Sequence, residues 1–217
     1  MAVLTKEQIL KKIKEGELSF TPKLDKFQVK AHSIDLRMGF TFLIPKHWHL
    51  TRQGREALSI DYYDPALPAG RQGTKNNHYE VVELEQRQYF DILPQEHVII
   101  STLESIKMPK DVMAILFPRS SVNRRGLSVE LSGIIDAGYE GQLIIPVTNN
   151  IRQTIRLYPG ERFCQVIFEE LAAPTKNMPS RFHKQDVIKG FMTEKSSAER
   201  NLIRKGDIKS LKSRYGF

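Results

Sequence analysis

The hydrophobic positions follow two different patterns along the chain. Near the N-terminus, apolar residues recur at helical spacing between residues 9 and 13, behind a polar run at 5–8 that has the form of a capping box. Gly16 offers a stop signal after this run. The pattern therefore predicts a helix from about residue 6 to 15.

Beyond this segment the helical period disappears, and short apolar runs take its place. They are rich in β-branched and aromatic residues and are separated by Gly, Pro, Asn or Asp. The clearest of them cover residues 33–44, 97–105, 111–118, 126–133, 141–149 and 161–171. Many short strands at close spacing predict a mainly β fold, a sandwich or a distorted barrel, and not a βαβ fold.

Two regions depart from the strand pattern. Residues 46–79 are poor in apolar side chains and rich in turn formers, which is typical of a long loop inserted between strands. Residues 172–217 begin irregularly and end in a segment that could hold one or two basic helical turns. We therefore expect a β domain over 1–171, with 46–79 as its inserted loop, and a basic C-terminal extension over 172–217.

Charge is concentrated in that extension. The net charge is +8, and residues 171–217 hold 11 Lys or Arg against 4 Asp or Glu. Such a tail could attract a polyphosphate, a nucleic acid or an acidic partner, or could simply be solvated. The single cysteine excludes an intrachain disulfide framework, and no apolar run approaches the roughly 20 residues that cross a bilayer. These features predict a cytoplasmic protein with no membrane partner.

Residues 118–150 carry the most informative chemistry. Arg119, Ser120 and Ser121 follow a strand and could form a phosphate cradle, because a guanidinium matches phosphate oxygens bidentately. Asp136 follows two apolar residues and precedes a turn, which would hold a carboxylate at the rim of a dry pocket. Tyr139 offers a flat face for a sugar or base. Taken singly, each is more often turn chemistry or packing.

The conjunction of these residues resembles the superfamily of dUTPases and dCTP deaminases. Arg119-Ser-Ser resembles its second motif, and the run Gly-Ile-Ile-Asp-Ala-Gly-Tyr-Glu-Gly at 133–141 resembles the dUTPase form of the third. Residues 159–165 resemble the fourth motif. Ala-His-Ser-Ile-Asp-Leu-Arg at 31–37 resembles the first, in wording nearer the deaminase branch. The resemblance implies a dUTPase-like distorted β-barrel of the β-clip or jelly-roll-like kind, with an N-terminal helix and a basic, partly helical tail.

The same resemblance implies how the triphosphate would be held. Arg119, Ser120 and Gln165 would contact phosphates, and Ser121 would supply a hydroxyl or backbone donor nearby. Asp35 would help to hold Mg²⁺ through water. Members with this architecture are usually homotrimers with sites between subunits, so self-association as a homotrimer is expected and a nucleic-acid partner is not.

The resemblance also assigns roles to the third motif. Asp136 would hold the sugar 3′-hydroxyl and position the attacking water. Tyr139 would lie under the deoxyribose and exclude a 2′-hydroxyl. Ser132 and Gly133 would present backbone groups to the pyrimidine, with Ile135 also among the nucleotide-binding positions.

Two reactions compete for this scaffold, hydrolysis of dUTP and deamination of dCTP. The deaminase branch uses a Glu on the strand after the third motif with a Ser and an Arg of the second, and Ser120 and Arg124 match the latter two. The Glu position falls on Pro146, which has no ionisable group and no N–H. Hydrolysis asks only for Mg²⁺, cationic groups and a carboxylate that orients water, which Arg119 and Asp136 supply. We therefore predict a Mg²⁺-dependent dUTP diphosphatase that forms dUMP and pyrophosphate, with Asp136 and Arg124 as catalytic residues.

Two alternatives remain. The chain could be a dCTP deaminase, mono- or bifunctional, with Glu130 or Glu140 as a substitute base, although strand alternation places Glu130 with Ser128 and Ser132 on what is more often a solvent face. It could instead be a non-catalytic deoxynucleotide-binding regulator. A zinc-dependent deaminase is unsupported, because no H-x-E occurs with C-x-x-C spacing.

The C-terminus departs from the dUTPase pattern. The dUTPase branch usually ends in a Gly-rich, Arg-containing motif that folds over the triphosphate, and no such run is present here. Our hypothesis is that the basic tail closes over phosphates, with Arg214 as a clamp. The alternative is a tail that is disordered or merely docked.

Overall fold

The computed structural model describes residues 2–58, 79–130, 133–175 and 197–216. The N-terminal helix α1 spans Lys6–Lys14, as the sequence predicts. Thr5 caps it: the Gln8 backbone N–H donates to the Thr5 hydroxyl, and the Thr5 N–H donates to the Gln8 side chain. The helix is anchored by a backbone bond from Leu4 to the Phe168 carbonyl (2.9 Å) and by its buried Ile9.

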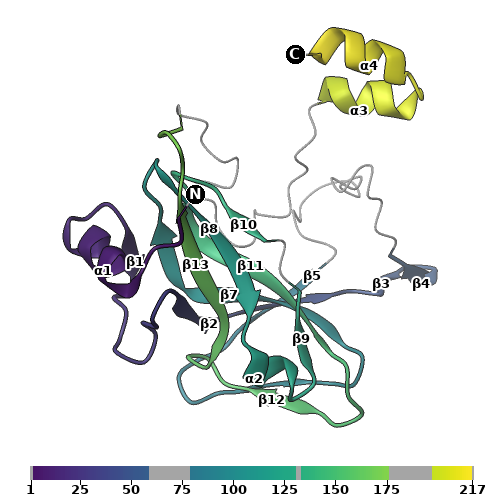
Figure 1. Ribbon diagram of the computed structural model, residues 1–217. Helices are drawn as coiled ribbons and strands as arrows, with labels where there is room; N and C mark the ends of the chain where they lie inside the picture. Colours follow the sequence, from purple (N-terminus) through teal and green to yellow (C-terminus); the bar gives the residue numbers. More distant parts are fainter. Residues whose placement is uncertain (1, 59–78, 131–132, 176–196, 217) are drawn as a thin grey trace. The chain divides into compact units, whose positions relative to one another are not determined.

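The described body of the protein is mainly β, which confirms the predicted fold class. Its largest sheet follows the order β10-β8-β13-β2-β7-β11-β9, with β1 paired to β7 and β5 paired to β2, and every pairing is antiparallel (Figure 1). A smaller sheet pairs β6 with β12. The strands of these two sheets are β1 (Ser19–Thr21), β2 (Ile34–Pro45), β5 (Tyr79–Glu83), β6 (Phe90–Ile92), β7 (His97–Lys107), β8 (Val112–Pro118), β9 (Leu127–Val129), β10 (Ile134–Ile135), β11 (Glu140–Asn149), β12 (Ile155–Leu157) and β13 (Arg162–Glu170). All six predicted strand segments contain a strand.

The connection between β9 and β10 forces this sheet to curl. The two strands lie at opposite ends of the sheet path, yet Val129 and Ile134 are only five residues apart. Five extended residues span roughly 17 Å. The edges of a flat seven-strand path lie about 29 Å apart at a strand spacing of about 4.8 Å. The sheet must therefore roll toward closure, which confirms the predicted distorted barrel.

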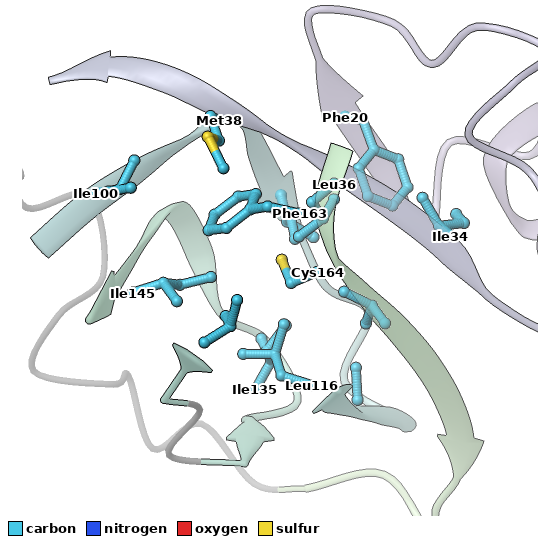
Figure 2. Close-up of a cluster of buried hydrophobic side chains, with 14 of the residues drawn as sticks. Phe20, Ile34, Leu36, Met38, Ile100, Leu116, Ile135, Ile145, Phe163 and Cys164 are labelled. Carbon is cyan, nitrogen blue, oxygen red and sulfur yellow. The ribbon is translucent and has the colours of Figure 1, made fainter. Parts of the chain in front are cut away.

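The curled sheet encloses one hydrophobic core. Ile135 of β10, Ile145 of β11 and Leu116 of β8 come from both ends of the sheet path and lie together in Figure 2. Phe163 and Cys164 of β13 fill the space between them and β2 and are fully buried. The packing of Ile135 in this core therefore fixes β10, the strand that lies within the third motif at 133–141.

A second unit comprises residues 46–78 and 188–217. In it, β3 (Trp48–Thr51) and β4 (Gly54–Ala57) form a hairpin at the start of the predicted inserted loop, and α3 (Ser197–Arg204) and α4 (Ile208–Tyr215) form the end of the basic extension. The expected partly helical tail is thus observed, whereas the predicted boundary at 171/172 stays a prediction. Among the described residues, no helix is long and apolar enough to span a bilayer.

Candidate functional site

The second, fourth and first motifs meet around a buried carboxylate. Asp35 lies on β2 and is 2% exposed. Its Oδ2 lies 3.2 Å from Nε of Arg119, which follows β8, and 3.1 Å from Nη1 of Arg162 at the start of β13. Gln165 is the register partner of both Asp35 on β2 and Phe117 on β8. The structure therefore brings Arg119, Gln165 and Asp35 together, and the phosphate-binding role of Arg119 and Gln165 stays a prediction.

Arg119 is also fixed by its backbone environment. Its Nη1 donates to the Arg162 carbonyl (2.8 Å), and its backbone N–H donates to the Phe163 carbonyl (3.2 Å). These contacts hold the guanidinium in place before any ligand arrives, so less side-chain entropy is lost on binding an anion.

The surroundings of Asp35 bear on the predicted metal role. Besides the two arginines, Lys30 Nζ lies 3.9 Å from the same Oδ2. A hydrated Mg²⁺ usually binds one or two carboxylates together with substrate phosphates, but a carboxylate among three cations does not fit a resident cation. In the described part of the chain, no three His, Cys, Asp or Glu side chains cluster as metal ligands. The Mg²⁺ role of Asp35 stays a prediction.

The turn that follows Arg119 is a short helix. Helix α2 spans Ser120–Asn123, with Arg124 as its C-cap residue. Ser120 and Arg124 are four residues apart, and the Arg124 N–H donates to the Ser120 carbonyl (3.0 Å). Their side chains therefore share one side of a helical turn, and both are exposed, while Ser121 is half-buried.

The third motif forms a tight turn anchored to its neighbours. The Tyr139 hydroxyl donates to the Gln142 carbonyl (2.6 Å), and burial raises the pKa of Tyr139 to about 12. Gly141 leaves room for that ring, since an added Cβ would lie 3.0 Å from the Tyr139 hydroxyl. Asp136 is exposed at the turn, as a sugar-binding carboxylate needs to be. Ile135 is buried, which leaves only its backbone for a ligand.

Strand geometry separates the two groups of site residues within one protomer. Ile135 pairs with Ala114, so Asp136 follows at the level of Met113, near the start of β8. Arg119 lies six residues further along, roughly 20 Å away at the rise of a strand. Asp136 and Arg119 of one chain therefore cannot touch directly.

The remaining predicted nucleotide-binding residues are Gly133, Ser132 and Arg214. Gly133 adopts φ +95°, a conformation that favours glycine, and its carbonyl accepts from the Leu116 N–H (2.8 Å). Ser132 lies outside the described residues. Arg214 lies on α4 in the second unit, so its predicted role as a clamp stays a prediction.

A second buried carboxylate, that of Glu104, is not among the residues predicted from the sequence. Glu104 of β7 is 1% exposed. It accepts from Gln28 Nε2 (2.7 Å) and from the Arg37 backbone N–H (3.0 Å), and Gln28 Nε2 also donates to the Asp35 carbonyl. Burial raises the pKa of Glu104. The sequence pattern could have indicated this position. Glu104 alternates with Thr102 and Ile106, which are buried, and this period of two places its side chain on the inner face of the strand.

Comparison with known proteins identifies the family of this fold and site. A family model described as dCTP deaminase-like matches residues 3–171. The chain is 33% identical over 190 residues to "dCTP deaminase, dUMP-forming" of Dictyoglomus thermophilum, covering 84% of this chain and 90% of that protein. It is 32% identical over 199 residues to the protein of the same name from Aquifex aeolicus, covering 86% and 98%.

The chain belongs to the dCTP deaminase-like family. Among solved structures, the 2′-deoxycytidine 5′-triphosphate deaminase of Agrobacterium tumefaciens matches with a TM-score of 0.55 and 22% identity. That match covers 76% of this chain and 48% of that one, and it supports the fold. The resemblance to the dUTPase and dCTP deaminase superfamily is confirmed.

The family corrects the predicted reaction. The prediction of a dUTP diphosphatase is wrong, because the relatives that align over most of this chain are named dCTP deaminases. Membership supports an enzyme of deoxynucleotide metabolism, but not the hydrolase class. The prediction placed too much weight on Pro146 and on the dUTPase-like wording of 133–141. Neither feature outweighs similarity spread over the whole β domain.

Proposed function

We propose that this chain is a dCTP deaminase that forms dUMP. The observation that carries the proposal is the match of residues 3–171 to the dCTP deaminase-like family, together with 33% identity over 190 residues to an enzyme of that name. A dUTPase-like fold alone would not distinguish deamination from hydrolysis. The family match does, because it includes the deaminase-like first motif and α1.

The arrangement of the second motif supports this reaction. Ser120 and Arg124 project from one helical turn, so both can reach a single pyrimidine ring or the water beside it. Arg119, held by Asp35, provides a fixed cation for the phosphates. Asp136 is free to accept the 3′-hydroxyl of a deoxyribose, with Tyr139 beneath the sugar.

The geometry of one protomer also supports assembly. Asp136 and Arg119 lie at opposite ends of β8, so a nucleotide site that uses short contacts to both would take one from each of two copies. We therefore include a homotrimer with sites between subunits in the proposal. Mg²⁺ would enter bound to the triphosphate, whose oxygens are its preferred ligands.

Product analysis of the full chain tests the proposal. The protein is incubated with dCTP and Mg²⁺, and nucleotides are separated by ion-exchange chromatography. We expect dCTP to disappear and dUMP to accumulate, with one ammonia and one pyrophosphate released for each dUMP formed. CTP is the matched control and should be consumed far more slowly. Unchanged dCTP, or conversion of dUTP without any turnover of dCTP, would reject the proposal.

A further inference from the structure

A chain of hydrogen-bonded side chains crosses the outer face of three neighbouring strands. Thr148 of β11 donates from its hydroxyl to Oε1 of Glu130 (2.9 Å), and the same hydroxyl lies 3.1 Å from Nδ1 of His97 on β7. Thr148 is the register partner of His97 on one side and of Ser128 on the other. Figure 1 shows β11 between β7 and β9. None of these contacts belongs to the groups of site residues described above.

The hydrogen-bond roles within this chain are determined by its chemistry. A threonine hydroxyl has one proton, which Thr148 gives to the Glu130 carboxylate. The His97 Nδ1 must therefore be protonated and donate to the Thr148 oxygen. Among the described residues, the Thr148 hydroxyl donates to Oε1 of the carboxylate. A carboxylate has further lone pairs, so Oε2 can accept from water or a ligand.

The position of Glu130 links it to the predicted site. Helix α2, with Ser120 and Arg124, leads directly into β9, and Glu130 follows β9 just before Gly133 and β10. Its backbone N–H donates to the carbonyl of Pro146 (2.9 Å). The Glu130 backbone therefore lies about one strand spacing, roughly 4.8 Å, from that of Pro146, a residue that cannot carry a proton.

The carboxylates of Asp35, Glu104 and Asp136 are less suited to proton transfer. Asp35 and Glu104 are buried and already bonded to cations or amides. Asp136 has its own place at the sugar. Glu130 is exposed, oriented by a hydroxyl and flanked by residues of the second and third motifs.

We infer that Glu130 is the proton-carrying group of the deamination, with Thr148 and His97 as its positioning residues; this rests on the proposed function. The oxygen of water forms a bond to C4 of cytosine while Glu130 takes one proton from that water and gives it to N3. Glu130 then takes the proton of the new C4 hydroxyl and gives it to the amino nitrogen. The C4–N bond breaks, ammonia leaves, a C4 carbonyl remains, and the carboxylate ends as it began.

The primary variant is Glu130→Gln in the full chain, assayed for ammonia release from dCTP. Because general acid–base catalysis contributes about 10²- to 10⁴-fold, kcat should fall at least ~100-fold. The KM for dCTP should change little, since the amide keeps the shape of the side chain. Glu83→Gln is the matched control, because Thr41 donates to Glu83 in a similar exposed cross-strand pair on β2 and β5 (3.1 Å). It should keep the wild-type rate.

The positioning residues give a second, independent test. Thr148→Val removes the hydroxyl and should lower kcat, whereas Thr148→Ser keeps the hydroxyl and should retain most of the rate. This pair decides the question if Glu130→Gln does not fold. A Glu130→Gln enzyme with the wild-type kcat, or equal rates for the Val and Ser variants at 148, would overturn the assignment while the deaminase function stands. Absence of ammonia from the wild-type protein would instead overturn the proposed function and this role with it.

Discussion

Arg119 Nε lies 3.2 Å from Asp35 Oδ2, and this ion pair joins two motifs separated by more than eighty residues of sequence. Arg162 shares the same carboxylate oxygen at 3.1 Å. The buried carboxylate is therefore shared by two cations, which keep a net positive charge, and it orients the one that the phosphates would meet. A phosphate site built in this way is organised by the fold and not by the ligand.

Replacing Asp35 should damage both stability and binding. Asp35→Ala leaves Arg119 and Arg162 without their shared anion, and breaking one side of a buried ion pair costs about 3 kcal/mol. Urea unfolding should show that loss, and the KM for dCTP should rise because Arg119 is no longer fixed. Asp91→Ala is the control, since it removes a more exposed pair with Arg156 and should cost far less stability. Equal stability losses for the two variants would contradict the account.

Arg124 should matter for rate and not for folding. It is exposed at the end of α2, so Arg124→Ala should change the free energy of unfolding by no more than about 0.5 kcal/mol. As a proposed catalytic residue it should lower kcat on dCTP by about 100-fold. The neighbouring Arg125, also exposed, gives the control variant Arg125→Ala, which should keep the wild-type kcat. A matching loss in both variants would point to a general charge effect.

Two substitutions of Tyr139 should affect stability and the selection of deoxyribose over ribose differently. Tyr139→Phe loses the bond to the Gln142 carbonyl and should destabilise the fold by about 1 kcal/mol. It should keep the preference for dCTP over CTP, because the ring remains. Tyr139→Ala removes the ring and should narrow that preference. Measuring kcat/KM for both nucleotides checks this, and an unchanged preference in the Ala variant would remove Tyr139 from the sugar site.

Glu104 should give stability a specific pH dependence. Burial raises its pKa above the ordinary value of 4.5, so the folded protein binds this proton more tightly than the unfolded chain. The stability gained from this tighter proton binding is fully present below about pH 4.5, and it is lost as pH rises through the folded-state pKa of Glu104. Glu104→Gln should flatten that part of the stability–pH curve measured by urea unfolding, whereas Glu83→Gln should not. A curve unchanged by Glu104→Gln would show that this carboxyl is not the group responsible.

Local signals in the sequence were sufficient for much of the fold. The Thr5 capping box and the β-branched runs predicted α1 and the main strands, because caps and strand periodicity act over a few residues. The short β10 and helix α2 were missed, since two to four residues carry too little pattern. The two-residue β10 exists because Ile134 and Ile135 find partners on β8.

The site could be predicted only in part, for a related reason. Arg119, Gln165 and Asp35 were identified by motif, but their proximity depends on the order of β8, β13 and β2 in the sheet. The contact of Glu130 with Thr148 depends on a cross-strand pairing over eighteen positions of sequence. The choice of reaction failed because it turned on Pro146 and the dUTPase-like wording of 133–141, whereas the match to the dCTP deaminase-like family covers residues 3–171.

Ammonia released per dCTP consumed by the full, unmodified chain is the most direct measurement of the central claim. The account predicts one ammonia for each dCTP lost, with multiple turnovers per active site. Tight binding of dCTP with no ammonia above the enzyme-free control would contradict it.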